Sequence, residues 1–198
     1  IAAISKHIDD LINKRDSLWV DWAWYHKIKN KYFWCMTIPM TSSWLWRNIL
    51  KFRAVFLPMI LYPVKPDSFV SFWHDPWASK GLILSSMCDY NQIMQSGIHT
   101  DAKANDYIHD GKVVLPYNSN QYLRQLWSQM QQLFSPSTKY DFVVWDMKPH
   151  SIKGVYNYVT VSAPLPASNW NSVIWSTDSQ PKHNLMQWKV INKAMLTR

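Results

Sequence analysis

The most regular pattern in this chain is the helical spacing of its apolar residues. Apolar side chains three or four positions apart lie on one face of a helix, and residues 4–25, 44–56 and 120–134 show this spacing. Thr41-Ser42-Ser43 offers an N-cap to the second segment, and Pro58 ends it. Three amphipathic helices are therefore predicted. Their apolar faces are Ile4, Ile8, Leu11, Ile12 and Trp19; Leu45, Ile49, Phe52 and Phe56; and Leu123, Leu126, Trp127, Met130, Leu133 and Phe134.

Shorter apolar runs favour strands. Residues 59–64 and 68–73 flank Lys65-Pro66-Asp67, where proline at a turn position with aspartate beside it is typical of a β-turn. This pattern predicts a β-hairpin. Residues 140–147 form a short strand candidate. Residues 155–161 alternate in a strand-like way, with a helix as the main competing interpretation.

The predicted fold class is α+β, dominated by helices, with a small β-hairpin or short sheet. Residues 1–78 are expected to hold the N-terminal helices and the hairpin. Residues 79–116 are polar and lack clear signals for where a helix or strand would begin or end, which indicates an irregular linker. Residues 117–198 are expected to form a helical region with short strands. This last region includes two closing helices, at 169–175 and 181–196.

Composition and charge narrow the class of partner. Hydrophobic residues make up 47% of the 198 positions, yet no apolar run approaches the roughly 18 residues needed to cross a bilayer. The formal net charge of +8 favours polyanionic partners such as nucleic acid, although many basic proteins bind none. All thirteen acids are aspartate, and the absence of glutamate weakens an enzymatic interpretation because glutamate is a common general acid or base. No membrane partner is expected.

Candidate catalytic and metal chemistry is sparse in the sequence. Cys35 and Cys88 lie far apart, so they are interpreted as free thiols of an intracellular protein, nuclear or cytoplasmic. His74-Asp75 would point to opposite faces of a strand, with Asp75 expected to cap the following turn. His99 and Asp101 supply only two potential metal ligands. We therefore predict no enzymatic activity, no catalytic residue, no metal and no cofactor.

Several tryptophan motifs are similar to one known family. Residues 42–53 contain the pattern Ser-Trp-x-Trp-Arg-x-Ile-Leu-Lys-x-Arg, and residues 71–77 fit Ser-Phe-Trp-x-Asp-x-Trp, with Gly81-Leu82 shortly after. Residues 169–183 add an Asn-Trp pair, Val-Ile-Trp and a Pro-Lys step. With these motifs the chain resembles the C-terminal region of a plant LINE-type non-LTR retrotransposon reverse transcriptase. The matched region is the connector that follows the family's polymerase core, plus the start of its zinc-binding domain.

This resemblance implies a non-catalytic fragment of an RNA-directed DNA polymerase polyprotein. The family's polymerase core would lie upstream, and its Cys and His zinc ligands would follow Arg198. Asp9-Asp10 lies in an amphipathic helical pattern and is interpreted as solvated surface rather than as a catalytic pair. One departure is Lys65-Pro66-Asp67, which replaces a Gly-rich turn of the family. The remainder of the parent reverse transcriptase is an implied partner.

Basic residues interleaved with aromatic residues suggest a surface for single-stranded RNA or DNA. The candidate nucleic-acid-binding residues are Lys29, Lys31, Trp44, Arg47, Lys51 and Arg53. The competing interpretation is that the tryptophans form the core and the cations are merely solvated. The alternative function is a decayed or orphan reading-frame product, a small structural or interaction module without nucleic acid affinity. A stand-alone hydrolase is disfavoured.

Overall fold

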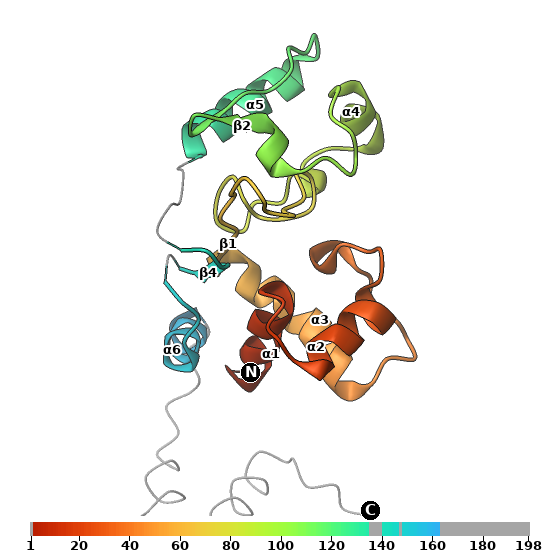
Figure 1. The fold of residues 1–198 in the computed structure, drawn as a ribbon, viewed down its shortest axis with the longest axis vertical. Coiled ribbons are helices and arrows are strands. Elements are labelled where there is room, and N and C mark those ends of the chain that lie inside the picture. Colours follow the sequence, from red (N-terminus) through yellow and green to blue (C-terminus); the bar gives the residue numbers. More distant parts are fainter. Residues whose placement is uncertain (1, 135–139, 147, 163–198) are drawn as a thin grey trace, which may run out of the picture. The chain divides into compact units, whose positions relative to one another are not determined.

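A computed structural model describes residues 2–134, 140–146 and 148–162, drawn as a coloured ribbon in Figure 1. The chain is mostly helical, with two small two-stranded antiparallel sheets in the described part, which confirms the predicted fold class. Residues 1–156 form one compact unit and residues 157–198 another, so the first unit contains both proposed domain boundaries. The expected helices at 169–175 and 181–196 lie outside the described residues. No helix within the described ranges is long and apolar enough to cross a membrane.

The N-terminal segment forms two helices instead of the single predicted one. Helix α1 spans Ala2–Ile12, α2 spans Leu18–Ala23, and a π-helical turn, Trp24–Ile28, follows directly. Lys14 ends α1 with a φ of 45°. Trp24 folds back and donates its indole N–H to the carbonyl of Leu11 at 3.0 Å. The same carbonyl accepts a hydrogen bond from the Lys14 N–H at 3.2 Å, so a turn and a tertiary contact together stabilise the end of α1.

Helix α3, Trp44–Phe56, has the predicted limits. The Ser43 hydroxyl accepts a hydrogen bond from the backbone N–H of Trp46, as an N-cap residue does. Ile49 and Phe56 of the predicted apolar face are buried. Helix α5, Gln121–Leu133, likewise begins after its cap, Asn120. Both helices confirm the spacing argument.

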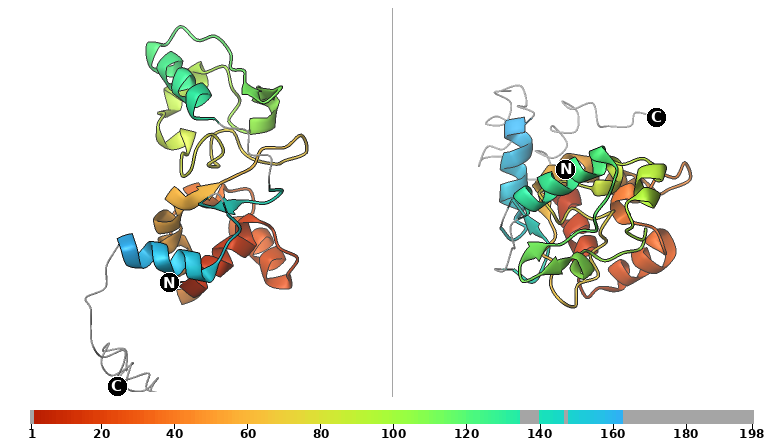
Figure 2. Two further views of the ribbon diagram at one scale, coloured as in Figure 1. Left: turned by 90° about the vertical axis from the view of Figure 1, so that its left-hand side faces the viewer. Right: turned by 90° about the horizontal axis from the view of Figure 1, so that it is seen from above.

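The hairpin predicted over 59–73 is not formed. Strand β1, Ile60–Leu61, pairs instead with β4, Val144–Trp145, and the two strands lie side by side in Figures 1 and 2. The turn itself is present, because the N–H of Ser68 donates to the carbonyl of Lys65 at 3.0 Å. Residues after the turn bond elsewhere: the N–H of Phe72 donates to Ala102 at 2.8 Å. Distant backbone partners therefore replaced the local ones. The strand expected within 140–147 is present as β4.

The segment 79–116 is more regular than expected. It contains α4, Tyr90–Gln95, and the strands β2, Ile108–His109, and β3, Lys112–Val113. Asp110 and Gly111 have φ values of 50° and 71°, the signs that a two-residue type I′ hairpin turn requires. The Asp-Gly pair was therefore the hairpin signal in the sequence. Val113 is buried in the same core as α5, so the segment belongs to the packed unit rather than to an irregular linker.

Aromatic side chains dominate that core. Phe72 and Trp73 are fully buried, and the ring of Phe72 lies 5.3 Å from that of Trp77 and 6.1 Å from that of Trp127. The Trp77 indole donates to the carbonyl of Phe72 at 2.8 Å. The motif at 71–77 is thus a packing motif. The fully buried or nearly buried members of the cluster are Val70, Phe72, Trp73, Trp77, Ala78, Leu84, Ile98, Ala104, Val113, Leu123, Leu126, Trp127 and Met130.

Two further expectations are wrong. Residues 155–161 lie in a helix, α6, Ile152–Ser162, so the competing helical interpretation holds.

Asp9 is not solvated surface: it is only 2% exposed and accepts hydrogen bonds from the Trp145 indole at 3.0 Å and the Asn13 amide at 2.8 Å. These two donors compensate the carboxylate for the water that it loses, because a buried charge requires such partners.

Candidate functional site

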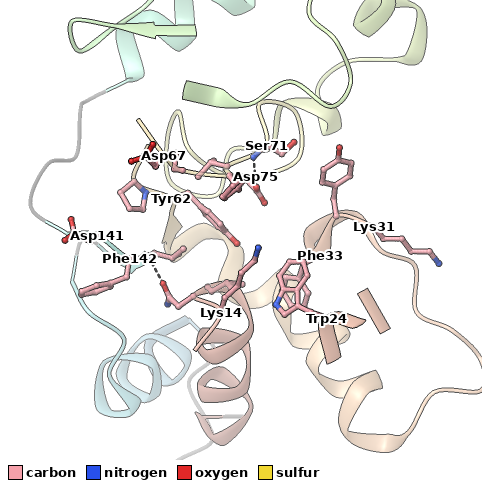
Figure 3. A pocket seen from close by; sticks show the side chains of 18 of the residues that line it. Lys14, Trp24, Lys31, Phe33, Tyr62, Asp67, Ser71, Asp75, Asp141 and Phe142 are labelled. Atoms are coloured by element: carbon pink, nitrogen blue, oxygen red, sulfur yellow. Dashed lines mark hydrogen bonds between the residues drawn. The ribbon is translucent and has the colours of Figure 1, made fainter. Parts of the chain in front are cut away.

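A pocket of about 540 Å³ opens where four segments meet (Figure 3). The end of α1 supplies residues 12–14, and the chain around the π-helical turn supplies Trp24 and residues 29–33. The loop after β1 contributes residues between 62 and 75, and residues 141–143 close the remaining side. The corner between α1 and α2 and the pairing of β1 with β4 therefore both build the pocket.

The floor of the pocket carries a carboxyl group. One oxygen of Asp75 accepts a hydrogen bond from the backbone N–H of Ser71 at 2.8 Å, whereas the other has no hydrogen-bond partner among the described residues. Burial raises the pKa of Asp75 to about 6, although the Ser71 N–H and the charge of Lys14 both oppose the rise. Asp75 thus caps the backbone before it, not the following turn, because the loop folds back over 71–75.

A lysine and a tyrosine face this carboxyl group. Lys14 extends from the end of α1 towards Asp75 in Figure 3, and its ammonium lies 4.7 Å from the ring centroid of Trp24. Lys14 and Asp75 do not form an ion pair with each other. The Tyr62 hydroxyl accepts a hydrogen bond from the Trp34 indole at 3.0 Å, and burial raises the pKa of Tyr62. The floor therefore combines one acceptor with two donors.

The rim combines cations with aromatic faces. Lys29 and Lys31 line the pocket and are exposed. Phe69 is 78% exposed, and the Lys103 ammonium lies 4.6 Å from the centroid of its ring. Lys29 has a φ of 54°, a conformation that costs a non-glycine residue energy and often marks functional sites. Such a rim attracts anions and offers flat surfaces for stacking.

Carboxylates also line the pocket, so its charge is mixed. Asp67 and Asp141 are exposed members of the lining. Asp141 forms an ion pair with Lys65, which reduces its repulsion of an anionic ligand. Asp75, in contrast, faces the pocket from its floor. A ligand here would meet cations first and a carboxyl group deeper in.

Comparisons of this chain with protein-family models, with curated proteins and with solved structures found no match. Its function is therefore inferred from its own residues. The pocket offers binding chemistry: cations for phosphate, aromatic faces for stacking, and a floor that accepts and donates hydrogen bonds.

The six residues predicted to bind nucleic acid do not share one surface. Only Lys29 and Lys31 line the pocket. Arg53 donates to the carbonyls of Phe33 and Met36, and Arg47 donates to that of Met40 at 3.0 Å, so both arginines hold the loop before α3. This loop has few backbone bonds of its own, and the two guanidinium groups satisfy its carbonyls.

The other two predicted residues are exposed on α3. Trp44 is 73% exposed at the start of the helix, and Lys51 is exposed further along it. Neither lines the pocket. The prediction missed Lys14, Trp24 and Asp75. The polar interruption at 13–17 between two apolar stretches was the available signal for Lys14.

A second cluster lies around His74, the residue before Asp75 in the chain. Its Nδ1 lies 3.0 Å from the Ser85 hydroxyl and 3.6 Å from the sulfur of Cys35. Its ring stacks on Tyr32 at 3.8 Å. Burial raises the pKa of Cys35 and lowers that of His74, so both groups are favoured in their neutral forms. The described residues hold no group of three or more potential metal ligands.

Proposed function

We propose that this chain is a non-catalytic segment that binds single-stranded RNA or DNA at the pocket between α1 and the loop after β1. The observation that carries the proposal is the gathering of Lys14, Lys29 and Lys31 around a pocket with aromatic walls. Lysine ammonium groups neutralise backbone phosphates, and aromatic faces stack on unpaired bases. The net charge of +8 supports the same class of partner.

The resemblance to a LINE-type reverse transcriptase supports a specific place for this activity. A connector between a polymerase core and a zinc-binding module would lie beside the template strand. In that setting the chain would help to hold the template, with the chemistry supplied by the rest of the polyprotein. Unpaired bases suit the pocket, because the bases of a duplex are stacked and already paired.

The alternative is a decayed or orphan reading-frame product that forms a structural module without nucleic acid affinity. Two observations favour it. Trp73, Trp77 and Trp127 are core residues, and Arg47 and Arg53 are engaged with the protein's own carbonyls. The two functions differ in one measurable property, the affinity for a single strand.

Fluorescence anisotropy of a labelled single-stranded RNA at about 50 mM and 200 mM salt tests the proposal. The double variant Lys29→Ala/Lys31→Ala removes two rim cations. Its matched control is Lys112→Ala/Lys153→Ala, which removes the same charge from exposed positions outside the pocket. Lys51→Ala tests α3 separately.

The proposal expects micromolar binding that weakens steeply with salt. The rim variant should lower the slope of log affinity against log salt by about 1.4, since each phosphate contact on a single strand contributes about 0.7. The control pair should change the slope much less. Absence of binding at low salt would support the structural alternative. Equal losses in the two double variants would remove the pocket as the binding site.

A further inference from the structure

The pocket floor presents a hydrogen-bond acceptor in a defined orientation. One oxygen of Asp75 is engaged by the Ser71 N–H at 2.8 Å, so the carboxylate cannot rotate freely. Ser71 is itself held, because it forms a β-bridge with Lys103. The second oxygen of Asp75, without a hydrogen-bond partner in the described structure, faces the pocket (Figure 3). An unoccupied, oriented carboxylate oxygen accepts hydrogen bonds from a ligand that offers N–H groups.

Two donors point into the same space. The Lys14 ammonium is held over Trp24 and is directed towards Asp75 (Figure 3). The Tyr62 hydroxyl already accepts a bond from Trp34, which leaves its own proton for an acceptor on a ligand. Lys14 and Tyr62 both line the pocket. The floor thus requires a ligand with adjacent donors next to an acceptor.

We propose that this pocket binds the base of a guanine nucleotide within a single strand, an inference that rests on the proposed function. The Watson–Crick edge of guanine carries two neighbouring donors, N1–H and the N2 amino group, beside the acceptor O6. The two donors would bond to Asp75, and O6 would accept from Lys14 and Tyr62. Lys29 and Lys31 at the rim would contact the flanking phosphates.

The other bases match this floor less well. Uracil has a single donor between two acceptors. Cytosine and adenine place a ring nitrogen, which is an acceptor, next to their amino group, and that nitrogen would face the carboxylate. An ionised carboxylate is acceptor-only, so each of these bases leaves a group unpaired or opposes two acceptors. At neutral pH the ionised form predominates, because the pKa of Asp75 is about 6.

The test uses short oligouridines that carry one central guanine, inosine, adenine or cytosine, which also prevents guanine-rich strands from associating. Anisotropy with the full chain at neutral pH should show the guanine strand binding about tenfold tighter than the other three. Inosine is the sharpest comparison, since it differs from guanine only by the missing N2 amino group. This comparison of strands uses the unaltered protein, so its result does not depend on the folding of a variant.

The variant Asp75→Asn should abolish the preference, so that the guanine strand binds this variant no tighter than the other three strands. Asp16→Asn removes one negative charge from an exposed position outside the pocket and should keep the preference. Equal affinity of the unaltered chain for all four strands would overturn the guanine inference and leave the proposed function standing. Failure to bind any of them at low salt would overturn both. A guanine preference retained by folded Asp75→Asn would also overturn the inference.

Discussion

The Asp75 carboxyl group is expected to lower the stability of the fold at neutral pH. Its pKa rises from 3.8 to about 6 on folding, chiefly because burial removes water from the charged form. A shift of this size corresponds to about 3 kcal/mol between the two protonation states. The substitution Asp75→Asn removes the charge and keeps an oxygen that accepts from the Ser71 N–H. The free energy of unfolding of the variant should therefore be higher than that of the unaltered chain, by up to about 3 kcal/mol.

The sign of the pH dependence follows from the direction of the shift. An acid with a raised folded pKa favours its neutral form in the folded state, so it imposes no penalty below pH 3.8. The penalty grows as pH rises from 3.8 towards about 6 and is complete above that. The gain from Asp75→Asn should accordingly be small near pH 4 and reach its maximum near pH 7.5.

Urea unfolding followed by tryptophan fluorescence measures this difference, with Asp16→Asn as the control for loss of an exposed charge. The comparison between variants at each pH isolates the one group, provided that unfolding is two-state. An equal gain at pH 4 and pH 7.5, or no gain at either, would refute the argument from burial. A stabilised variant that loses guanine preference would indicate that Asp75 is retained for binding at a cost in stability.

Three further stability changes follow from the fold, each measured by urea unfolding against the unaltered chain. Asp9→Ala should cost about 3 kcal/mol, because it leaves the buried Trp145 indole and the Asn13 amide without their acceptor; a cost below about 0.5 kcal/mol would contradict that role. Ser43→Ala should cost about 1 kcal/mol through loss of the α3 cap, and Ser43→Asp should restore most of it. Gly81→Ala should cost about 2 kcal/mol or more, since Gly81 has a φ of 70° and an added Cβ would lie 2.8 Å from Pro58 Cα. An unchanged urea midpoint for Gly81→Ala would mean that the backbone around residue 81 shifts to accommodate the added Cβ at little cost.

The candidate site shows why only part of this protein could be derived from its sequence. Lys29 and Lys31, which line the pocket, were predicted because basic and aromatic residues adjoin in the chain. Lys14 and Asp75 were missed as a pair because sixty-one positions separate them, and only the folded chain brings both to one pocket. Arg47 and Arg53 looked identical to binding residues in sequence, yet backbone carbonyls of a neighbouring loop already engage them.

The sequence by itself determined the elements whose stabilising interactions are local. Helices α3 and α5 follow from apolar residues three and four positions apart and from caps that adjoin the first turn, and both have nearly the predicted limits. The tertiary structure alone decided the pairing of β1 with β4, the break after α1 and the burial of Asp9. In each of these cases the stabilising partner lies far away in the chain. Hydrogen bonds to that partner decide the local structure, because a single one is worth about as much as a local preference. The apolar spacing within one segment does not reveal such a partner.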